Sequence, residues 1–344
     1  MCAETPQSPV SERRTLASLT DSFKRRFSYL RLSVTDACNF GCSYCLPGGY
    51  SRACSPAAPL LPAEIRNLVA AFAQLGVSKV RLTGGEPTLR RDILEIARTI
   101  SETPGIRTVA ITTNGYRLKE LAEPLFAAGV TALNVSVDSL DPDVFMRITD
   151  ARSTPLAKVL SGVDEALRMG FRPIKINVVL LRGMNDSELP SFIEWSRTKP
   201  VHIRFIELMR TAQNGDLFAQ HHVSTGPLCE RLIREGWISK PREMDDGPAR
   251  EFIHPEFRGS IGIISPYAHG FCESCNRLRV TSRGDLRLCL FGEADEPLRP
   301  FLRDSSQRPE LIERIRSALK EKPLSHLLNE GKYGNTENLS SIGG

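Results

Sequence analysis

Short runs rich in β-branched residues alternate with helical stretches over the first two thirds of the chain. The expected strands are 29–35, 79–83, 107–113, 131–137, 174–180 and 201–207. The expected helices are 62–75, 90–103, 116–128, 141–148, 155–169 and 187–198. Alternating strands and helices form right-handed βαβ units around a parallel sheet. The pattern therefore predicts an α/β fold, an incomplete (βα)6 TIM-like barrel that lacks two of the usual eight units.

Polar residues alternate with apolar ones within these expected strands. In the first strand, Arg31 lies between Leu30 and Leu32. The same alternation selects Ser33, Thr35, Lys79, Arg81, Thr83, Thr112, Asn114, Asn134, Ser136, Asp138, Lys175, Asn177, His202 and Arg204. Because a period of two puts each set on one face, and crossover helices cover the outer face, the polar set should point inward. Buried Lys and Arg need partners, so we expect a cavity for an anionic ligand. The alternative is a row of edge strands with one solvated face, which six successive parallel strands disfavour.

The pattern changes after residue 208. Residues 211–222 resemble a loop, 227–236 a helix, and 250–253, 261–265, 277–281 and 286–290 short strands, before helices at 308–320 and 323–330. The expected organisation is a mobile N-terminal arm (1–27), the partial barrel (28–210), a C-terminal α+β extension (211–330) and a tail (331–344). A mitochondrial transit peptide is an alternative for the arm, which Glu4, Glu12 and Asp21 disfavour.

The composition is that of an ordinary globular protein. Of the 344 residues, 41% are hydrophobic and 25% charged, and no apolar run approaches the roughly 20 residues of a membrane span. A net charge of +5 suits a small anionic ligand better than a nucleic acid. Nine cysteines without an apolar signal segment favour a reducing compartment, the cytoplasm, and metal ligation.

Three cysteines lie within eight residues, at Cys38, Cys42 and Cys45. One loop can direct all three toward an iron–sulfur cluster. A cubane has four irons, and all six histidines follow residue 200, so one iron would stay open to a ligand. A zinc site, which normally needs four ligands, and inert or disulfide-bonded cysteines are the alternatives.

A second set of three consists of Cys272, Cys275 and Cys289. It suits either a cluster with an open iron or a zinc ion that His269 completes. Arg277 and Arg279 follow on one side of an expected strand, beside the metal. Guanidinium groups bind phosphate oxygens in pairs, so these two arginines suggest a phosphorylated substrate.

A glycine-rich turn, Thr83-Gly-Gly-Glu-Pro87, follows the second expected strand. Two glycines let the backbone approach a ligand closely, although an ordinary turn at the end of a strand has the same composition.

Taken together, these motifs resemble the GTP 3′,8-cyclase family (molybdenum cofactor biosynthesis protein A) of the radical S-adenosylmethionine (SAM) superfamily. The resemblance rests on the run Tyr29-Leu-Arg-Leu-Ser-Val-Thr-Asp-Ala-Cys38, the cysteine loop with Tyr44, the Gly-Gly-Glu-Pro turn, Phe271-Cys-x2-Cys-Asn-Arg-x-Arg279 and the terminal Gly-Gly. It covers about residues 27–344. It implies a radical SAM partial barrel whose C-terminal extension carries a second cluster. The 5′-deoxyadenosyl radical would take the 3′ hydrogen of GTP, and carbon 3′ would then attack carbon 8. The product, 3′,8-cyclo-7,8-dihydro-GTP, begins molybdenum cofactor biosynthesis.

The resemblance also implies roles for individual residues. Cys38, Cys42 and Cys45 would hold a 4Fe–4S cluster that binds SAM, and Cys272, Cys275 and Cys289 a second 4Fe–4S cluster that binds guanine. The implied SAM contacts are Tyr44, Gly85, Ser136 and Met209. The implied GTP contacts are Arg31, Arg81, Thr112, Lys175, Arg277, Leu278 and Arg279. The Gly343-Gly344 tail would reach into the active site. One departure is Gly41, where the family often has Arg.

The implied partners are GTP, an electron donor and the next enzyme of the pathway, cyclic pyranopterin monophosphate synthase. No nucleic acid or membrane is expected, and the chain would be a monomer or homodimer. One alternative is another two-cluster radical SAM enzyme, which modifies a peptide and would not need so many interior cations. The other is a zinc-stabilised nucleic-acid-binding protein. It is disfavoured because the basic residues are spread over strands and not clustered on a helix.

Overall fold

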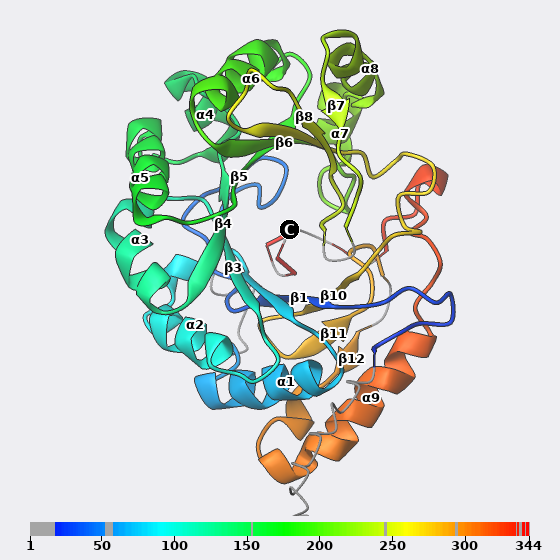
Figure 1. The fold of residues 1–344 in the computed structure, drawn as a ribbon. Coiled ribbons are helices and arrows are strands. Elements are labelled where there is room, and N and C mark those ends of the chain that lie inside the picture. Colours follow the sequence, from blue (N-terminus) through cyan, green and yellow to red (C-terminus); the bar gives the residue numbers. More distant parts are fainter. Residues whose placement is uncertain are drawn as a thin grey trace, which may run out of the picture.

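The computed structural model describes residues 18–51, 58–152, 154–243, 246–292, 295–334, 336, 339–340 and 342–343. Within these residues the strands form one sheet of twelve, in the order β12-β11-β10-β1-β2-β3-β4-β5-β6-β9-β8-β7. The sheet curves into a ring that helices surround (Figure 1).

Six parallel strands form the centre of the sheet. They are β1 (Tyr29–Ser33), β2 (Lys79–Thr83), β3 (Thr108–Thr113), β4 (Val130–Ser136), β5 (Ile174–Leu180) and β6 (Val201–Glu207). The helices between them are α1 (Pro62–Gln74), α2 (Ile93–Ser101), α3 (Leu118–Ala127), α4 (Pro142–Thr149), α5 (Leu156–Met169) and α6 (Leu189–Thr198). All six expected strands and helices are present with slightly different ends, so the predicted (βα)6 partial barrel is confirmed.

Local sequence explains where several helices begin and end. Pro62 occupies the first turn of α1, where a missing N–H costs nothing. The Asp141 carboxylate accepts hydrogen bonds from the first free N–H groups of α4. Gly170 ends α5 in the left-handed conformation that favours glycine.

The C-terminal extension continues the sheet at both edges. β10 (Arg277–Val280) pairs in parallel with β1, and β9 (Ser260–Ile264) pairs in parallel with β6. β11 (Asp285–Arg287) and β12 (Glu296–Pro297) follow β10, while β8 (Arg250–Ile253) and β7 (Ile238–Ser239) follow β9, all antiparallel. The second cysteine set is therefore placed next to β1, the strand that leads to the first.

The remaining helices are α7 (Gly215–His221), α8 (Gly226–Arg234) and α9 (Arg308–Lys320). The loop expected at 211–222 is wrong, because α7 forms where Phe218 stacks on His222 and contacts Tyr267. The helix expected at 323–330 is also wrong, apart from a 3₁₀ turn at Leu328–Glu330. The carbonyls of Pro323 and Leu324 accept hydrogen bonds from the Arg25 side chain and not from the N–H groups of a helix.

The apolar half of each strand packs against the helices. Leu30, Leu32, Val80, Leu82 and Ile111 are fully buried in the main core. The polar half faces the interior of the ring. Among the described residues, no helix has both the length and the apolar character to cross a membrane.

The arm expected to be mobile through residue 27 is corrected for residues 18–27, whereas residues 1–17 lie outside the described part. Leu19 and Phe27 are buried, and the Leu19 N–H donates to the Leu75 carbonyl at 3.1 Å. The two apolar side chains belong to the main core. Their burial holds this segment against the fold.

Candidate active site

A cavity inside the ring is lined by both cysteine sets and by the polar faces of the strands. From the first set it receives Cys38, Cys42 and Cys45, and from the second Cys272, Cys275 and Cys289. The predicted inward residues that line it are Arg31, Lys79, Arg81, Thr83, Thr112, Asn114, Asn134, Ser136, Asp138, Lys175, Asn177 and Arg204. The alternative of solvated edge strands is wrong, because the polar face is enclosed.

The cavity wall is strongly cationic. Its Lys and Arg residues are Arg31, Lys79, Arg81, Lys175, Arg204, Arg277, Arg279 and Lys322. In the part of the chain that the structure describes, only Asp138 and Glu207 contribute carboxylates to this wall. Like charges held together in a poorly solvated space attract anions strongly. The cavity therefore suits a polyanion.

Several buried polar atoms at this wall lack a hydrogen-bond partner among the residues that the structure describes. They include Arg277 Nε, Arg204 Nε, Asn134 Oδ1, Asn177 Oδ1 and His326 Nε2. Buried polar groups are almost always paired in native proteins. Their concentration at one wall is what a ligand-binding cavity requires.

Burial and the neighbouring cations shift the pKa values of two groups here. The pKa of Lys175 is lowered to about 7, first by burial and then by the charges of Arg204 and Arg81. Burial raises the pKa of the Tyr29 phenol, but Arg81, Arg31 and the other nearby charges outweigh it and lower the pKa to about 7. The Arg81 Nε–H donates to the Tyr29 hydroxyl.

The first cysteine loop is held by backbone bonds to the end of α4. The Gly41 N–H donates to the Thr149 carbonyl and the Ser43 N–H to the Ile148 carbonyl, both at 3.0 Å. An added Cβ at Gly41 would lie 3.5 Å from the Asp150 carboxylate, where an arginine could reach that charge. The loop thus keeps its anchoring without a side chain at position 41.

The two neighbouring strand ends support the same loop. The buried Glu86 carboxylate accepts hydrogen bonds from Thr88, Thr113 and the Asn114 N–H, which joins the end of β2 to the end of β3. The Asn114 side chain donates to Asn39 Oδ1 at 2.9 Å and lies 4.0 Å from Cys38 Sγ. These bonds fix the rim of the cavity around the first thiol.

The glycines of the turn after β2 pack against this loop. The Gly85 N–H donates to the Thr35 carbonyl at 2.8 Å, and the Glu86 N–H to the Ala37 carbonyl. A Cβ on Gly84 would clash with the Thr35 carbonyl, and one on Gly85 with the Ala37 carbonyl. The two glycines therefore let the turn pack closely against the backbone of the cysteine loop. Gly85 also lines the cavity.

The four residues expected to contact SAM lie at the same cavity. Tyr44, Gly85, Ser136 and Met209 all line it. The Tyr44 hydroxyl donates to Asp138 Oδ2 at 2.8 Å, and the Val179 N–H donates to Asp138 Oδ1. Burial raises the pKa of Asp138 to about 6. This carboxylate joins the first cysteine loop to β5.

The described part of the C-terminal segment, residues 339–340 and 342–343, lies inside the ring of strands (Figure 1). The Gly343 carbonyl accepts hydrogen bonds from Arg31 Nη2 and Arg279 Nη1, both at 2.7 Å. A Cβ at Gly343 would clash with the Thr83 side chain. Gly344 lies outside the described residues.

The two thiol sets differ in electrostatic environment. Burial raises the pKa of Cys38 to about 11 and of Cys45 to about 12. At Cys275 burial also raises the pKa, but the charges of Arg277 and Lys322 outweigh it and lower the pKa to about 7. Thiolate formation at Cys275 therefore costs less than at Cys38 or Cys45.

One expected contact is not supported. Leu278 is buried in the main core on the face of β10 opposite Arg277 and Arg279, because adjacent strand residues point to opposite sides. Its side chain does not line the cavity. His269 is exposed and is not among the lining residues, so a zinc site completed by His269 finds no support.

The GTP contacts that the family resemblance implied do not include three cations of the cavity wall. Lys79 and Arg204 occupy inward positions of the strand alternation, which was the signal for them. Lys322 follows α9, and no pattern in the neighbouring sequence predicted its place at the cavity, because only tertiary packing brings it to the thiols.

The thiols fit clusters better than single metal ions. Among the described residues, no three His, Cys, Asp or Glu side chains converge closely enough for one metal ion. Cubane ligands bind different irons and need not converge on one point. Three thiols per set, without a fourth protein ligand at hand, match a cluster with an open iron.

Comparison with known proteins agrees with this geometry. Residues 32–196 match the Radical SAM superfamily, and residues 201–328 match Molybdenum Cofactor Synthesis C. The GTP 3′,8-cyclase of Aeromonas hydrophila subsp. hydrophila is 52% identical over 343 residues, which are 98% of this chain and 100% of that protein. The GTP 3′,8-cyclase of Vibrio cholerae serotype O1 is 52% identical over 94% of this chain and 97% of that protein.

The chain belongs to the GTP 3′,8-cyclase family. It is a radical SAM enzyme, and the cofactors of the family are SAM and two 4Fe–4S clusters. Among solved structures, Streptococcus suis SuiB bound to S-adenosylmethionine is similar, with a TM-score of 0.59 and 12% identity over 86% of this chain and 68% of that chain. At that identity the likeness concerns the fold alone, and GTP 3′,8-cyclase membership rests on the two relatives above.

Proposed function

We propose that this chain converts GTP to 3′,8-cyclo-7,8-dihydro-GTP in the first step of molybdenum cofactor biosynthesis. The single observation that carries the proposal is one cavity that, among the described residues, is lined by both cysteine sets and by eight Lys and Arg side chains. The full-length similarity to GTP 3′,8-cyclases supports the same reaction.

Residues of the first cysteine set and its surroundings would hold SAM. Cys38, Cys42 and Cys45 supply the thiolates of the first 4Fe–4S cluster, with Tyr44, Gly85, Ser136 and Met209 around the bound SAM. When bound, these cofactors supply the 5′-deoxyadenosyl radical that removes the 3′ hydrogen of GTP. Asn114 keeps the cysteine loop in one position relative to the strands, because its N–H donates to the Glu86 carboxylate and its side-chain amide donates to Asn39.

The opposite side of the cavity would hold GTP. Cys272, Cys275 and Cys289 supply the second 4Fe–4S cluster, beside which the guanine binds. The triphosphate is held by the inward cations Arg31, Lys79, Arg81, Lys175, Arg204, Arg277 and Arg279, with Thr112 nearby. Charge-assisted bonds to phosphate at several points fix the nucleotide's orientation as well as its affinity.

The chain's own contribution is positioning and exclusion of water. A primary radical reacts with almost any nearby C–H bond, so selectivity for carbon 3′ depends on where the ribose is held. The Gly343 carbonyl accepts hydrogen bonds from Arg31 and Arg279, and so restrains two cations of the cavity wall. Cofactor chemistry with protein-controlled orientation is the usual division of labour in such enzymes.

The proposed function needs an electron donor and a downstream enzyme, cyclic pyranopterin monophosphate synthase. It also needs a reducing compartment, and we propose the cytoplasm. The seven cysteines among the described residues are all free thiols, which supports this placement.

The decisive experiment is anaerobic reconstitution followed by iron and zinc analysis, then addition of SAM, GTP and a reductant. We expect about eight irons per chain, the sum of two cubanes, with 5′-deoxyadenosine formed and GTP consumed. The same iron content without GTP consumption would favour the peptide-modifying alternative. Zinc without iron would favour the nucleic-acid-binding alternative.

Substitution of Arg277 tests the phosphate side. We expect Arg277→Ala to weaken GTP binding by about 10- to 100-fold, since a hydrogen bond to a charged group contributes about 1.5–3 kcal/mol. Cleavage of SAM should persist. The matched control is Arg316→Ala, an exposed arginine on α9. Equilibrium dialysis with GTP provides the measurement, and equal affinity in wild type and Arg277→Ala would remove Arg277 from the phosphate site.

A further inference from the structure

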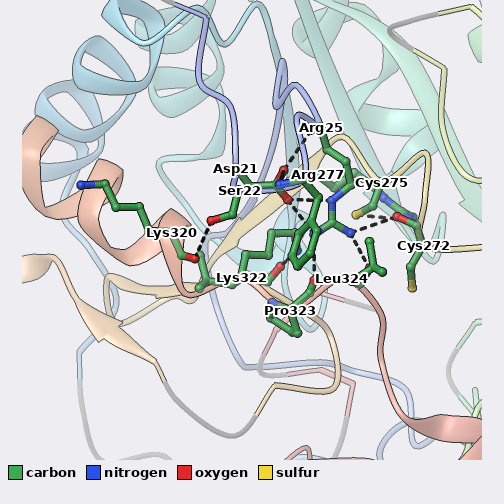
Figure 2. Close-up of polar contacts among 12 residues, drawn as sticks. Asp21, Ser22, Arg25, Cys272, Cys275, Arg277, Lys320, Lys322, Pro323 and Leu324 are labelled. Carbon is green, nitrogen blue, oxygen red and sulfur yellow. Dashed lines mark hydrogen bonds and ion pairs between the residues drawn. The ribbon is translucent and has the colours of Figure 1, made fainter.

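A buried arginine of the N-terminal segment contacts the second cysteine loop. Arg25 Nη1 donates to the Cys272 carbonyl at 3.1 Å and to the Leu324 carbonyl at 2.7 Å. Its Nη2 donates to the Pro323 carbonyl at 2.7 Å. Figure 2 shows these bonds running from one guanidinium to two separate chain segments, one at Cys272 and one at Pro323 and Leu324.

A carboxylate orients this guanidinium. Asp21 Oδ2 accepts from Arg25 Nε at 2.6 Å, and Asp21 Oδ1 accepts from the backbone N–H groups of Phe23 and Arg25. The side chain of Asp21 is fully buried and that of Arg25 is 6% exposed. A buried ion pair is stabilised when further hydrogen bonds satisfy both partners. Here backbone carbonyls accept from Arg25, and backbone N–H groups donate to Asp21.

The Cys272 carbonyl is a central point of the second loop. It also accepts the Cys275 N–H at 3.1 Å, which closes the turn between two of the three thiols. The Arg25 contact therefore acts on the backbone that sets the spacing of both side chains. This arrangement resembles the outer-shell bonds that orient metal ligands in other proteins.

The third thiol is tied to the same C-terminal segment. The buried Lys322 ammonium donates to the Leu288 carbonyl, immediately before Cys289. The Ser22 hydroxyl donates to the Lys320 carbonyl at 3.0 Å, which joins the N-terminal segment to the end of α9. Residues 21–25 and 320–324 thus support both halves of the second cysteine set.

We propose that Arg25, oriented by Asp21, is a positioning residue for the second cluster. It holds the Cys272–Cys275 turn in the conformation that receives the cluster, and it joins this turn to residues 323–324. The inference rests on the proposed function, because it assumes a cluster at the second set. Among the described residues, the hydrogen bonds of Arg25 reach the second cysteine loop and not the first, so the first cluster should not depend on this residue.

The test compares iron retention in four reconstituted proteins. They are the wild type, Arg25→Met, Arg299→Met and a reference variant with Cys272, Cys275 and Cys289 changed to Ala. Arg299 is the matched control: it pairs with Glu64 and donates to the carbonyls of residues 58 and 59, away from both cysteine sets. Iron content, Mössbauer spectra and the rate of iron loss to a chelator are measured under anaerobic conditions.

We expect about eight irons in the wild type and in Arg299→Met, and about four in Arg25→Met and the reference variant. The remaining cluster of Arg25→Met should respond spectroscopically to SAM as in the reference variant. If Arg25→Met is too unstable to purify, Arg25→Lys replaces it, because an ammonium cannot reproduce the planar fork. In Arg25→Lys, half of the iron should leave at least about tenfold faster than in the wild type.

Retention of both clusters at the wild-type rate in Arg25→Met, or in Arg25→Lys where that variant is used, would overturn the proposal. Equal loss of both clusters in Arg25→Met would overturn it as well, since that result indicates general destabilisation. A wild type with only about four irons would contradict the proposed function itself, so the two failures can be told apart.

Discussion

At the scale of single residues, the environment of the cavity shifts the pKa values of Lys175 and Tyr29 toward neutral pH. Lys175 is an inward residue of β5 that is surrounded by other cations. Burial and these neighbours disfavour its charged form, so its pKa falls to about 7. A bound triphosphate would reverse the balance by supplying negative charge.

We therefore expect GTP affinity to fall as pH rises above about 7. Below this pKa Lys175 carries its proton before and after binding, whereas above it binding must take up a proton, which costs at most tenfold in affinity per pH unit. Calorimetry from about pH 6 to about pH 9 in buffers of different ionisation enthalpy measures the affinity and the proton uptake.

Two variants separate the contributions to this pH dependence. Lys175→Arg keeps its charge throughout the range and should flatten the dependence. Tyr29, whose pKa is also lowered to about 7, becomes an anion in the same range and would repel phosphate. Tyr29→Phe removes only the contribution of the Tyr29 phenolate to the pH dependence of GTP affinity. An unchanged slope in Lys175→Arg would show that Lys175 does not contact the triphosphate.

At the scale of elements, the turn after β2 and the loop after β1 are packed backbone to backbone. Glycine is required at positions 84 and 85 because the carbonyls of Thr35 and Ala37 occupy the space of a Cβ. The contact transmits the position of β2 to the first cysteine loop. An ordinary turn at the end of a strand would not require glycine at both positions.

We expect Gly85→Ala to destabilise the fold by about 1–3 kcal/mol, in the range of other overpacking substitutions, and to impair the first cluster. Iron content should fall by about four, with SAM cleavage lost and the second cluster kept. Gly215→Ala is the control, since a Cβ there meets only the far end of Arg210. Chemical denaturation and iron analysis give both readouts, and an intact first cluster in Gly85→Ala would contradict the expectation.

At the scale of the whole molecule, segments near both ends of the described chain contact the C-terminal extension. Arg25 donates to the Cys272 carbonyl, and Arg279 donates to the Gly343 carbonyl. The strands β9 and β10 extend the barrel sheet at its two edges. The proposed sites for GTP and the second cluster are therefore completed by segments distant in sequence.

We expect Gly343→Ala to reduce GTP turnover by about 100-fold, because a Cβ clashes with Thr83 and displaces the carbonyl from Arg31 and Arg279. SAM cleavage should become uncoupled from GTP consumption. Gly331→Ala is the control, because Gly331 has a similar positive φ of 74° but open space around it. The ratio of 5′-deoxyadenosine to cyclised product is the measurement, and a wild-type ratio in Gly343→Ala would exclude a role for the tail.

The sequence by itself determined the six strand–helix units and the inward direction of their polar residues. Both follow from short-range periodicity, because alternation in a strand assigns each side chain to one face whatever lies beyond it. For that reason Arg31, Arg81, Lys175 and Thr112 could be assigned to the cavity in advance. The family resemblance implied a GTP contact for Leu278, whereas the structure places its side chain in the core.

Only the tertiary structure decided which distant segments complete the site. The pairing of β10 with β1, the approach of Lys322 to the thiols and the packing of residues 18–27 all join parts of the chain far apart in sequence. No local pattern reports such contacts, because their free energy is gained only when both partners are in place. The mobile arm was wrong for residues 18–27 because Leu19 and Phe27 are buried in the main core. The helix expected at 323–330 was wrong because the carbonyls of Pro323 and Leu324 accept hydrogen bonds from Arg25.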